Sequence, residues 1–139
     1  MKQKIEELAV SARGQGLTEF TREVSDVVSS SGISSGLCTV FISHTSASLV
    51  LQENADPSAR RDLEDFLVRL VPEDDPHYTH TMEGADDMPA HIKAALTSTS
   101  ISIPVTDGRL ALGTWQGIYL WEHRAARSRR RVVVHVLGE

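Results

Sequence analysis

Hydrophobic and polar positions alternate along most of the chain, and the alternation has two periods. Segments of period two that are rich in β-branched and aromatic residues predict strands, because successive strand side chains point to opposite faces. The predicted strands are residues 2–9, 36–43, 47–54, 101–105, 109–113, 114–123 and 131–138. An Asp107-Gly108 pair between two of them is a hairpin signal, so we expect an antiparallel meander in the last third of the chain.

Three segments with a period near 3.6 predict helices. Residues 21–31 place three valines on one face and end at a glycine. Asp56 as N-cap and Pro57 at the first helical position begin a second helix, which runs to about Leu70. The expected buried stripe of this helix consists of Leu63, Phe66, Leu67 and Leu70. A shorter helix is expected over residues 89–97, after an irregular acidic loop.

The order of these segments predicts an α+β fold. Strands outnumber helices, and the helices lie between groups of strands, which is typical of an antiparallel β-sandwich with covering helices. The chain has 139 residues, so we expect a single domain over residues 1–139. A (β/α)₈ barrel is excluded, because it needs about 250 residues.

Charge and composition narrow the classes of partner. The net charge of −5 gives no support to nucleic-acid binding. We expect the basic stretch 124–131 in a hairpin loop. It is interpreted as a solvated turn, and the alternative is a patch that binds phosphate. No run of about 20 apolar residues or export signal is visible, so no membrane partner is expected. Cys38 is the only cysteine, which fits a reducing cytoplasm, and its place in an apolar strand predicts an inert thiol.

His44 lies where a predicted buried strand ends, in the stretch "FISHTSASL". The hydroxyl groups of Thr45, Ser46 and Ser48 follow it, and together with backbone N–H groups they are suited to phosphate oxygens. The alternative is a strand-end histidine beside a hydroxyl-rich turn.

The stretch "HTMEGADDMPAHIK" holds two imidazoles, His80 and His91, around the carboxylates of Glu83, Asp86 and Asp87. Imidazole and carboxylate groups are ligands for divalent metal ions, so the stretch predicts a metal site assembled from several elements. The alternatives are a solvated acidic loop, or aspartates that cap the following helix.

The predicted strand 114–123 carries two sets of candidate residues. Trp115, Tyr119 and Trp121 share one face, which is core, a subunit interface or a stacking wall for a planar ring. Gln116 and Glu122 share the other face, where Gln116 would orient polar ligand atoms. A carboxylate among apolar neighbours needs a partner, so Glu122 predicts a nearby arginine or metal ion.

Three long stretches, "CTVFISHTSASLVLQENADP", "VPEDDPHYTHTMEGADDMPAHIKAAL" and "RLALGTWQGIYLWEHR", resemble the YjbQ family, also called the secondary thiamine-phosphate synthase family. The resemblance implies an antiparallel sandwich that assembles as a homotrimer. It also implies a weak thiamine-phosphate synthase activity, which joins an aminopyrimidine pyrophosphate to a thiazole phosphate and is secondary to an unknown main role.

The same resemblance implies a set of site residues and a divalent metal ion, zinc or magnesium. The implied metal ligands are His44, His80 and His91. The implied catalytic residues are His44, Asp87, His91 and Glu122, and those that bind the small phosphorylated substrate are Thr45, Ser46, Lys93, Trp115 and Gln116. Two other functions stay open: a non-catalytic module that binds a metal or small anion, and a structural trimer whose histidines only bridge elements.

Overall fold

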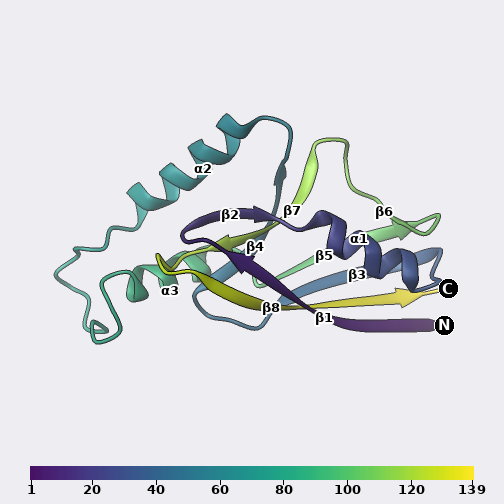
Figure 1. Ribbon diagram of the computed structural model, residues 1–139, viewed down its shortest axis with the longest axis horizontal. Coiled ribbons are helices and arrows are strands. Elements are labelled where there is room, and N and C mark those ends of the chain that lie inside the picture. The colour runs from purple at the N-terminus through teal and green to yellow at the C-terminus, as the bar shows by residue number, and fades with distance from the viewer.

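The computed structural model describes residues 1–139 and contains two antiparallel sheets and three helices (Figure 1). The strands are β1 (Lys2–Ala12), β2 (Gly16–Glu19), β3 (Ser35–Ile42), β4 (Ala47–Glu53), β5 (Ser100–Thr106), β6 (Arg109–Leu110), β7 (Gln116–Glu122) and β8 (Ser128–Gly138). The helices are α1 (Thr21–Ser30), α2 (Pro57–Leu70) and α3 (Asp87–Leu96). The first sheet has the order β1-β8-β3-β5-β6 and the second the order β2-β7-β4, which confirms the α+β prediction.

The main core lies between the two sheets and α1. Alternate residues of β8, Val132, Val134 and Val136, are fully buried there, as period-two patterning requires. The predicted valine face of α1 packs against the same core. Cys38 on β3 is also buried, and burial raises the pKa of its thiol to about 11, in line with the prediction of an inert cysteine.

The predicted meander in the last third of the chain is wrong. Only β5 and β6 form a hairpin, whereas β7 lies between β2 and β4 in the second sheet and β8 lies between β1 and β3 in the first. The reason is the composition of β7, which is buried at every position from Gly117 to Glu122. A strand that is apolar on both faces is stable only as a central strand between two packed layers.

Helix α2 covers the outer face of the second sheet and forms a smaller core. This core consists of Leu17, Leu67, Tyr119 and Trp121. Leu63 is partly buried against it, but Phe66 and Leu70 are 55% and 54% exposed, so the predicted four-residue stripe is wrong for these two.

The structure also extends several predicted elements. Strand β2 was not predicted, and β1 runs three residues further than expected. The basic stretch is a loop only as far as Arg127, because β8 begins at Ser128 and carries the remaining arginines in a strand. None of the three helices is both long and apolar enough to span a membrane.

Candidate metal centre

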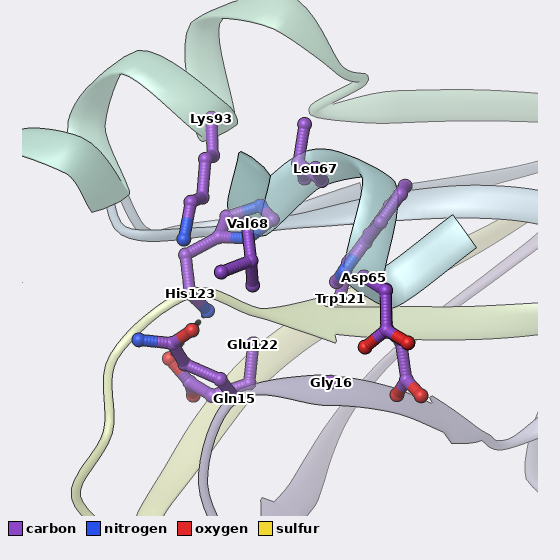
Figure 2. A pocket seen from close by; sticks show the side chains of 10 residues that line it. Gln15, Gly16, Asp65, Leu67, Val68, Lys93, Trp121, Glu122 and His123 are labelled. Carbon is purple, nitrogen blue, oxygen red and sulfur yellow. Dashed lines mark hydrogen bonds between the residues drawn. The ribbon is translucent and has the colours of Figure 1, made fainter. Parts of the chain in front are cut away.

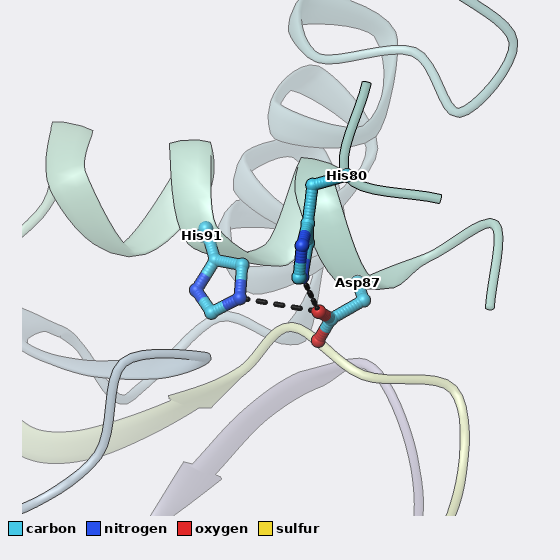
Figure 3. Close-up of side chains that lie close together, drawn as sticks. All are labelled: His80, Asp87 and His91. Carbon is cyan, nitrogen blue, oxygen red and sulfur yellow. Dashed lines mark hydrogen bonds and ion pairs between the residues drawn. The ribbon is translucent and has the colours of Figure 1, made fainter. Parts of the chain in front are cut away.

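His80, Asp87 and His91 converge at the start of α3 (Figure 3). Oδ2 of Asp87 lies 2.7 Å from His80 Nε2 and 3.2 Å from His91 Nε2. The three potential ligand atoms all lie within 4.8 Å of one another. Asp87 and His91 are four residues apart on α3, so the helical period places them on one side, and the preceding loop brings His80 to them.

Asp87 is held in a strongly polar environment although its side chain is only 3% exposed. Burial alone would raise the pKa of this carboxyl, but the hydrogen bond from His80 and the charges of Arg124 and His91 lower it below its usual range. The Arg124 guanidinium donates from Nη1 to Oδ1 at 2.6 Å, so Oδ2 is the oxygen turned to the imidazoles. The first turn of α3 adds the favourable field of the helix N-terminus.

The tautomer of His91 follows from its two contacts. Nδ1 lies 3.1 Å from the carbonyl oxygen of Thr45, and only a protonated Nδ1 makes this a hydrogen bond. A neutral His91 therefore presents the Nε2 lone pair to the Asp87 carboxylate. Two lone pairs at 3.2 Å repel unless a cation lies between them, either a proton or a metal ion. A histidine that donates Nδ1–H to a backbone carbonyl is a common arrangement for metal ligands, because it orients the ring and raises its basicity.

Arg124 fixes the loop that carries the cluster. Besides Asp87, it contacts Asp86 Oδ2 through Nε at 3.0 Å and the carbonyl of Glu83 through Nη2 at 2.9 Å. Asp86 occupies the N-cap position of α3 but makes no side-chain cap bond. Its carboxylate instead accepts from the Ala125 N–H and from Arg124, and both lower its pKa. The alternative of a side-chain cap is therefore wrong for Asp86, and the loop after β7 anchors both aspartates, while Asp87 keeps the expected place in the first turn of the helix.

The structure does not bring His44 to this cluster. Its Nε2 accepts a hydrogen bond from the Arg131 N–H at 2.8 Å, and its Nδ1 lies 3.4 Å from Arg130 Nη1. Burial and the charges of these two arginines lower its pKa, so His44 is neutral at ordinary pH. With Nε2 engaged to the backbone of β8, this imidazole does not serve as a third histidine ligand in this arrangement.

Glu122 has the arginine partner that the sequence predicts. Arg130 donates from Nε to Oε1 at 2.7 Å and from Nη2 to Oε2 at 2.5 Å. The Ser128 hydroxyl and the N–H groups of His123 and Arg124 complete five hydrogen bonds to the carboxylate. Burial would raise the pKa of Glu122, but these donors lower it. The side chain is fully buried and saturated, so it organises the loop around it and has no free oxygen for a ligand.

The remaining predicted residues lie in three places. The Thr45 carbonyl contacts His91, and the Ser46 hydroxyl accepts from Arg130 at 2.9 Å, so the "HTSA" turn is joined to both networks. Lys93 follows His91 by two residues and therefore projects from nearly the opposite side of α3.

Gln116 and Trp115 lie at the far end of β7, about 20 Å along the strand from Glu122. The Gln116 side chain accepts from the Gly113 N–H in its own turn, and Trp115 is 63% exposed, outside the strand. Trp115 therefore does not share the packed face of Tyr119 and Trp121, contrary to the sequence prediction.

Two buried residues beside the site, Arg130 and His123, were not among the predicted site residues. Arg124 was predicted only as a positive charge near the phosphates, and not as the partner of Asp86 and Asp87. Arg130 lies two residues before Val132, so extending the predicted strand 131–138 back by one residue would have placed its side chain on the buried face with Val132, next to Glu122. His123 is 1% exposed, and burial together with the Lys93 charge lowers its pKa to about 3. Its position directly after β7, which is buried from Gly117 to Glu122, is the sequence feature that could have indicated its burial.

The whole chain is similar to one group of known proteins. The profile described as UPF0047 protein YjbQ-like matches residues 6–139. The chain belongs to the YjbQ/UPF0047 family. UPF0047 protein sll1880 from Synechocystis sp. is 54% identical over 138 residues, which cover 99% of this chain and 94% of the relative. UPF0047 protein YjbQ from Escherichia coli O157:H7 is 44% identical, over 95% of this chain and 96% of its own.

Solved structures of YjbQ-like proteins share the fold. A YbjQ-like protein of unknown function from Sulfolobus solfataricus has a TM-score of 0.91 and 30% identity, with 99% of each chain covered. A YjbQ/UPF0047 family protein from Clostridium acetobutylicum has a TM-score of 0.87 and 34% identity, over 95% of this chain and 99% of that one. These relatives establish the family and the α+β fold, and they name no activity.

Proposed function

We propose that this YjbQ family member binds a divalent metal ion at His80, Asp87 and His91 and uses it on a small phosphorylated substrate. The observation that carries the proposal is the convergence of three potential ligand atoms within 4.8 Å of one another, with His91 held through Nδ1 by the Thr45 carbonyl so that a neutral ring turns its Nε2 lone pair to Asp87. Two imidazole nitrogens and one carboxylate oxygen form a ligand set that suits zinc and leaves coordination positions open.

The charge balance of the site favours an anionic substrate. The Arg124 guanidinium already neutralises Asp87, so an ion bound beside them would retain nearly its full charge of about +2 for outside ligands. The exposed Thr45 hydroxyl and the Ser46 hydroxyl lie in the turn that contacts His91, where they are available to phosphate oxygens. A bound divalent ion would supply Lewis-acid stabilisation of charge on a departing phosphate or pyrophosphate.

The first reaction to test is the thiamine-phosphate synthase type, in which an aminopyrimidine pyrophosphate is joined to a thiazole phosphate with release of pyrophosphate. In this proposal Asp87 orients the two imidazoles, and Arg124 holds Asp87 and the acidic loop in place. Glu122 acts indirectly, because its ion pair with Arg130 positions the turn that carries Ser46. We propose no direct catalytic step for Glu122 or His44.

The experiment combines metal analysis with this assay on the same samples. Wild type, Asp87→Asn and His91→Ala are compared with His77→Ala, a control in the same acidic loop whose imidazole is 92% exposed. We expect about one zinc ion per chain in wild type and the control, and at least a tenfold loss of affinity in the other two variants. Stoichiometric metal that survives in Asp87→Asn and His91→Ala, with circular dichroism unchanged, would refute the ligand set.

A metal- or anion-binding module without chemistry is the second candidate function. It is favoured by the saturation of Glu122, which leaves no free buried carboxylate beside the cluster to act as a general base. This candidate predicts metal binding that depends on Asp87, with synthase turnover at the same background level in wild type and variants. Turnover that is lost together with the metal would instead support the enzyme.

We also propose that the protein assembles as a homotrimer through the outer face of its first sheet. Leu37 pairs directly with Leu137, and both point away from the core together with Phe41 and Ile5. These side chains are 44%, 38%, 46% and 64% exposed, respectively, and such an apolar face is typical of subunit contacts. Light scattering should give three times the chain mass for wild type and a lower mass for Phe41→Glu. A monomeric wild type would refute this proposal and leave the metal site untouched.

A further inference from the structure

A second pocket, the Lys93 pocket, lies on the other side of α3 from the metal cluster. It has a volume of about 200 Å³ and is lined by residues of α2, α3, β7 and the turn between β1 and β2 (Figure 2). None of the three cluster residues lines it. Drug-sized ligands occupy pockets of roughly 300–1,000 Å³, so this one fits only a smaller molecule.

Lys93 reaches into this pocket from α3 without a protein partner (Figure 2). The residue is only 3% exposed, and its ammonium group makes no hydrogen bond or ion pair with any other residue, although the charges of Glu73 and Asp86 act on it without contact. No sealed polar atom in the protein lacks a partner, so the ammonium group keeps some contact with the pocket, but it has lost most of its water without gaining a protein acceptor, which is unfavourable. The arrangement therefore calls for an anionic group inside the pocket.

His123 supplies a second unpartnered donor beside Lys93. Its Nε2 lies 2.9 Å from the buried Ser48 hydroxyl, and we assign the hydroxyl as the donor because its proton has no other acceptor. The neutral ring then carries its proton on Nδ1, which bonds to no protein atom. No sealed polar atom in the protein lacks a partner, so Nδ1 keeps some accessible surface, and the pocket that His123 lines is the space open to it. Two buried donors, one of them charged, thus point into the same space.

The opposite end of the pocket has the opposite charge. Asp65 from α2 lies there, well separated from Lys93 in Figure 2; it is exposed to solvent and makes no hydrogen bond or ion pair with the protein. The neighbouring Glu64 accepts the Leu17 N–H at 2.7 Å and adds further negative charge. Trp121 forms an aromatic wall of the pocket, a surface suited to methylene groups and to cations. A phosphate ester would be repelled from this acidic end.

We propose that the Lys93 pocket binds a small zwitterion of the amino-acid class. Its carboxylate lies against Lys93 and His123 Nδ1, and its ammonium group faces Asp65. Two charges of opposite sign at the two ends of a small pocket select for a ligand that carries both, and they discriminate against a simple anion or a simple amine. The site is independent of the metal centre and of the reaction proposed for it.

Calorimetric titration of the full chain tests this assignment. The probes are glycine, β-alanine and γ-aminobutyrate, in which the two charges are progressively further apart, with acetate, propylamine and inorganic phosphate as single-charge comparisons. We expect saturable binding of at least one zwitterion and weaker binding of all three comparisons. The dissociation constant should rise about tenfold or more in Lys93→Met, which keeps the apolar stem, and by a smaller factor in Asp65→Asn.

Two matched variants separate this site from the rest of the protein. Lys2→Met removes an exposed lysine, and Asp87→Asn removes the carboxylate of the metal cluster, so both should bind the zwitterion as wild type does. Absence of saturable binding by every zwitterion would overturn the proposal, as would an unchanged dissociation constant in Lys93→Met. Phosphate binding that depends on Lys93 and not on Asp65 would also overturn it, in favour of a simple anion site.

Discussion

The buried ion pair between Arg130 and Glu122 gives the sharpest stability prediction, through the substitution Arg130→Met. The two side chains are 11% and 0% exposed and share two hydrogen bonds, at 2.5 and 2.7 Å. Removal of one partner from a buried pair typically lowers the free energy of unfolding by about 3–5 kcal/mol, because the other charge stays buried. Ser128 and two backbone N–H groups still donate to Glu122, so we expect a loss of about 3 kcal/mol.

The pH dependence of this loss tests its cause. The folded-state pKa of Glu122 is lowered in wild type, so its contribution is present above the unfolded-state pKa of about 4.3 and is lost as pH falls through the folded-state value. Without Arg130, burial raises the pKa of Glu122 instead. The difference between wild type and Arg130→Met should therefore be largest near neutral pH and shrink below about pH 5.

Urea denaturation followed by tryptophan fluorescence measures the effect, at one fixed chain concentration because association changes apparent stability. Arg129→Met is the matched control, since Arg129 is exposed on the opposite face of the same strand, and we expect a change within about 0.5 kcal/mol. A loss below about 1 kcal/mol in Arg130→Met, or a loss that does not vary with pH, would refute the reasoning.

Three further predictions follow from other buried groups. His123 has a folded-state pKa of about 3, against 6.5 for a free imidazole, so between these pH values the unfolded chain binds a proton that the folded chain does not, and stability falls as pH decreases. Urea denaturation at a series of pH values should show a loss of about 2 kcal/mol by pH 5. A stability that does not change with pH would contradict this. Cys38 should react with a thiol reagent only after unfolding, because its pKa is about 11 and it is buried; rapid labelling of the native protein would contradict this. In Gly36→Ala the new Cβ would lie 2.1 Å from the Leu137 carbonyl oxygen. We therefore expect urea denaturation to show that the free energy of unfolding falls by at least about 2 kcal/mol. A stability equal to that of wild type would show that the paired strands can separate freely.

The sequence determined the secondary elements where local chemistry is decisive. The valine periodicity of α1, the Asp56-Pro57 start of α2 and the alternation of β8 all appear in the structure as the pattern requires. Each depends on residues within one or two turns or strands, and the packing reinforces the local preference. The same holds for Glu122, whose need for a partner is a property of any carboxylate in a buried strand.

The sequence also determined part of the candidate site. The spacing of Asp87 and His91 fixes their common side once a helix forms between them, and His80 lies on the loop that leads into that helix. The sequence could not determine which of the three predicted histidine ligands lies outside the metal cluster. His44 has the same side chain as His80, but the Arg131 N–H of β8, far away in the sequence, occupies its Nε2.

Only the tertiary structure decided how the last strands are arranged and what they bury. The alternation of β7 and β8 predicts two strands but not the sheet that each one joins, because that choice depends on which faces of the whole molecule remain to be covered. That arrangement places Arg130 against Glu122 and turns His123 and Lys93 toward one pocket. The local sequence determines the hydrophobic period of each segment and the charge of each residue. Long-range packing determines the partners of a buried charge, and at this site it brings the interacting side chains together.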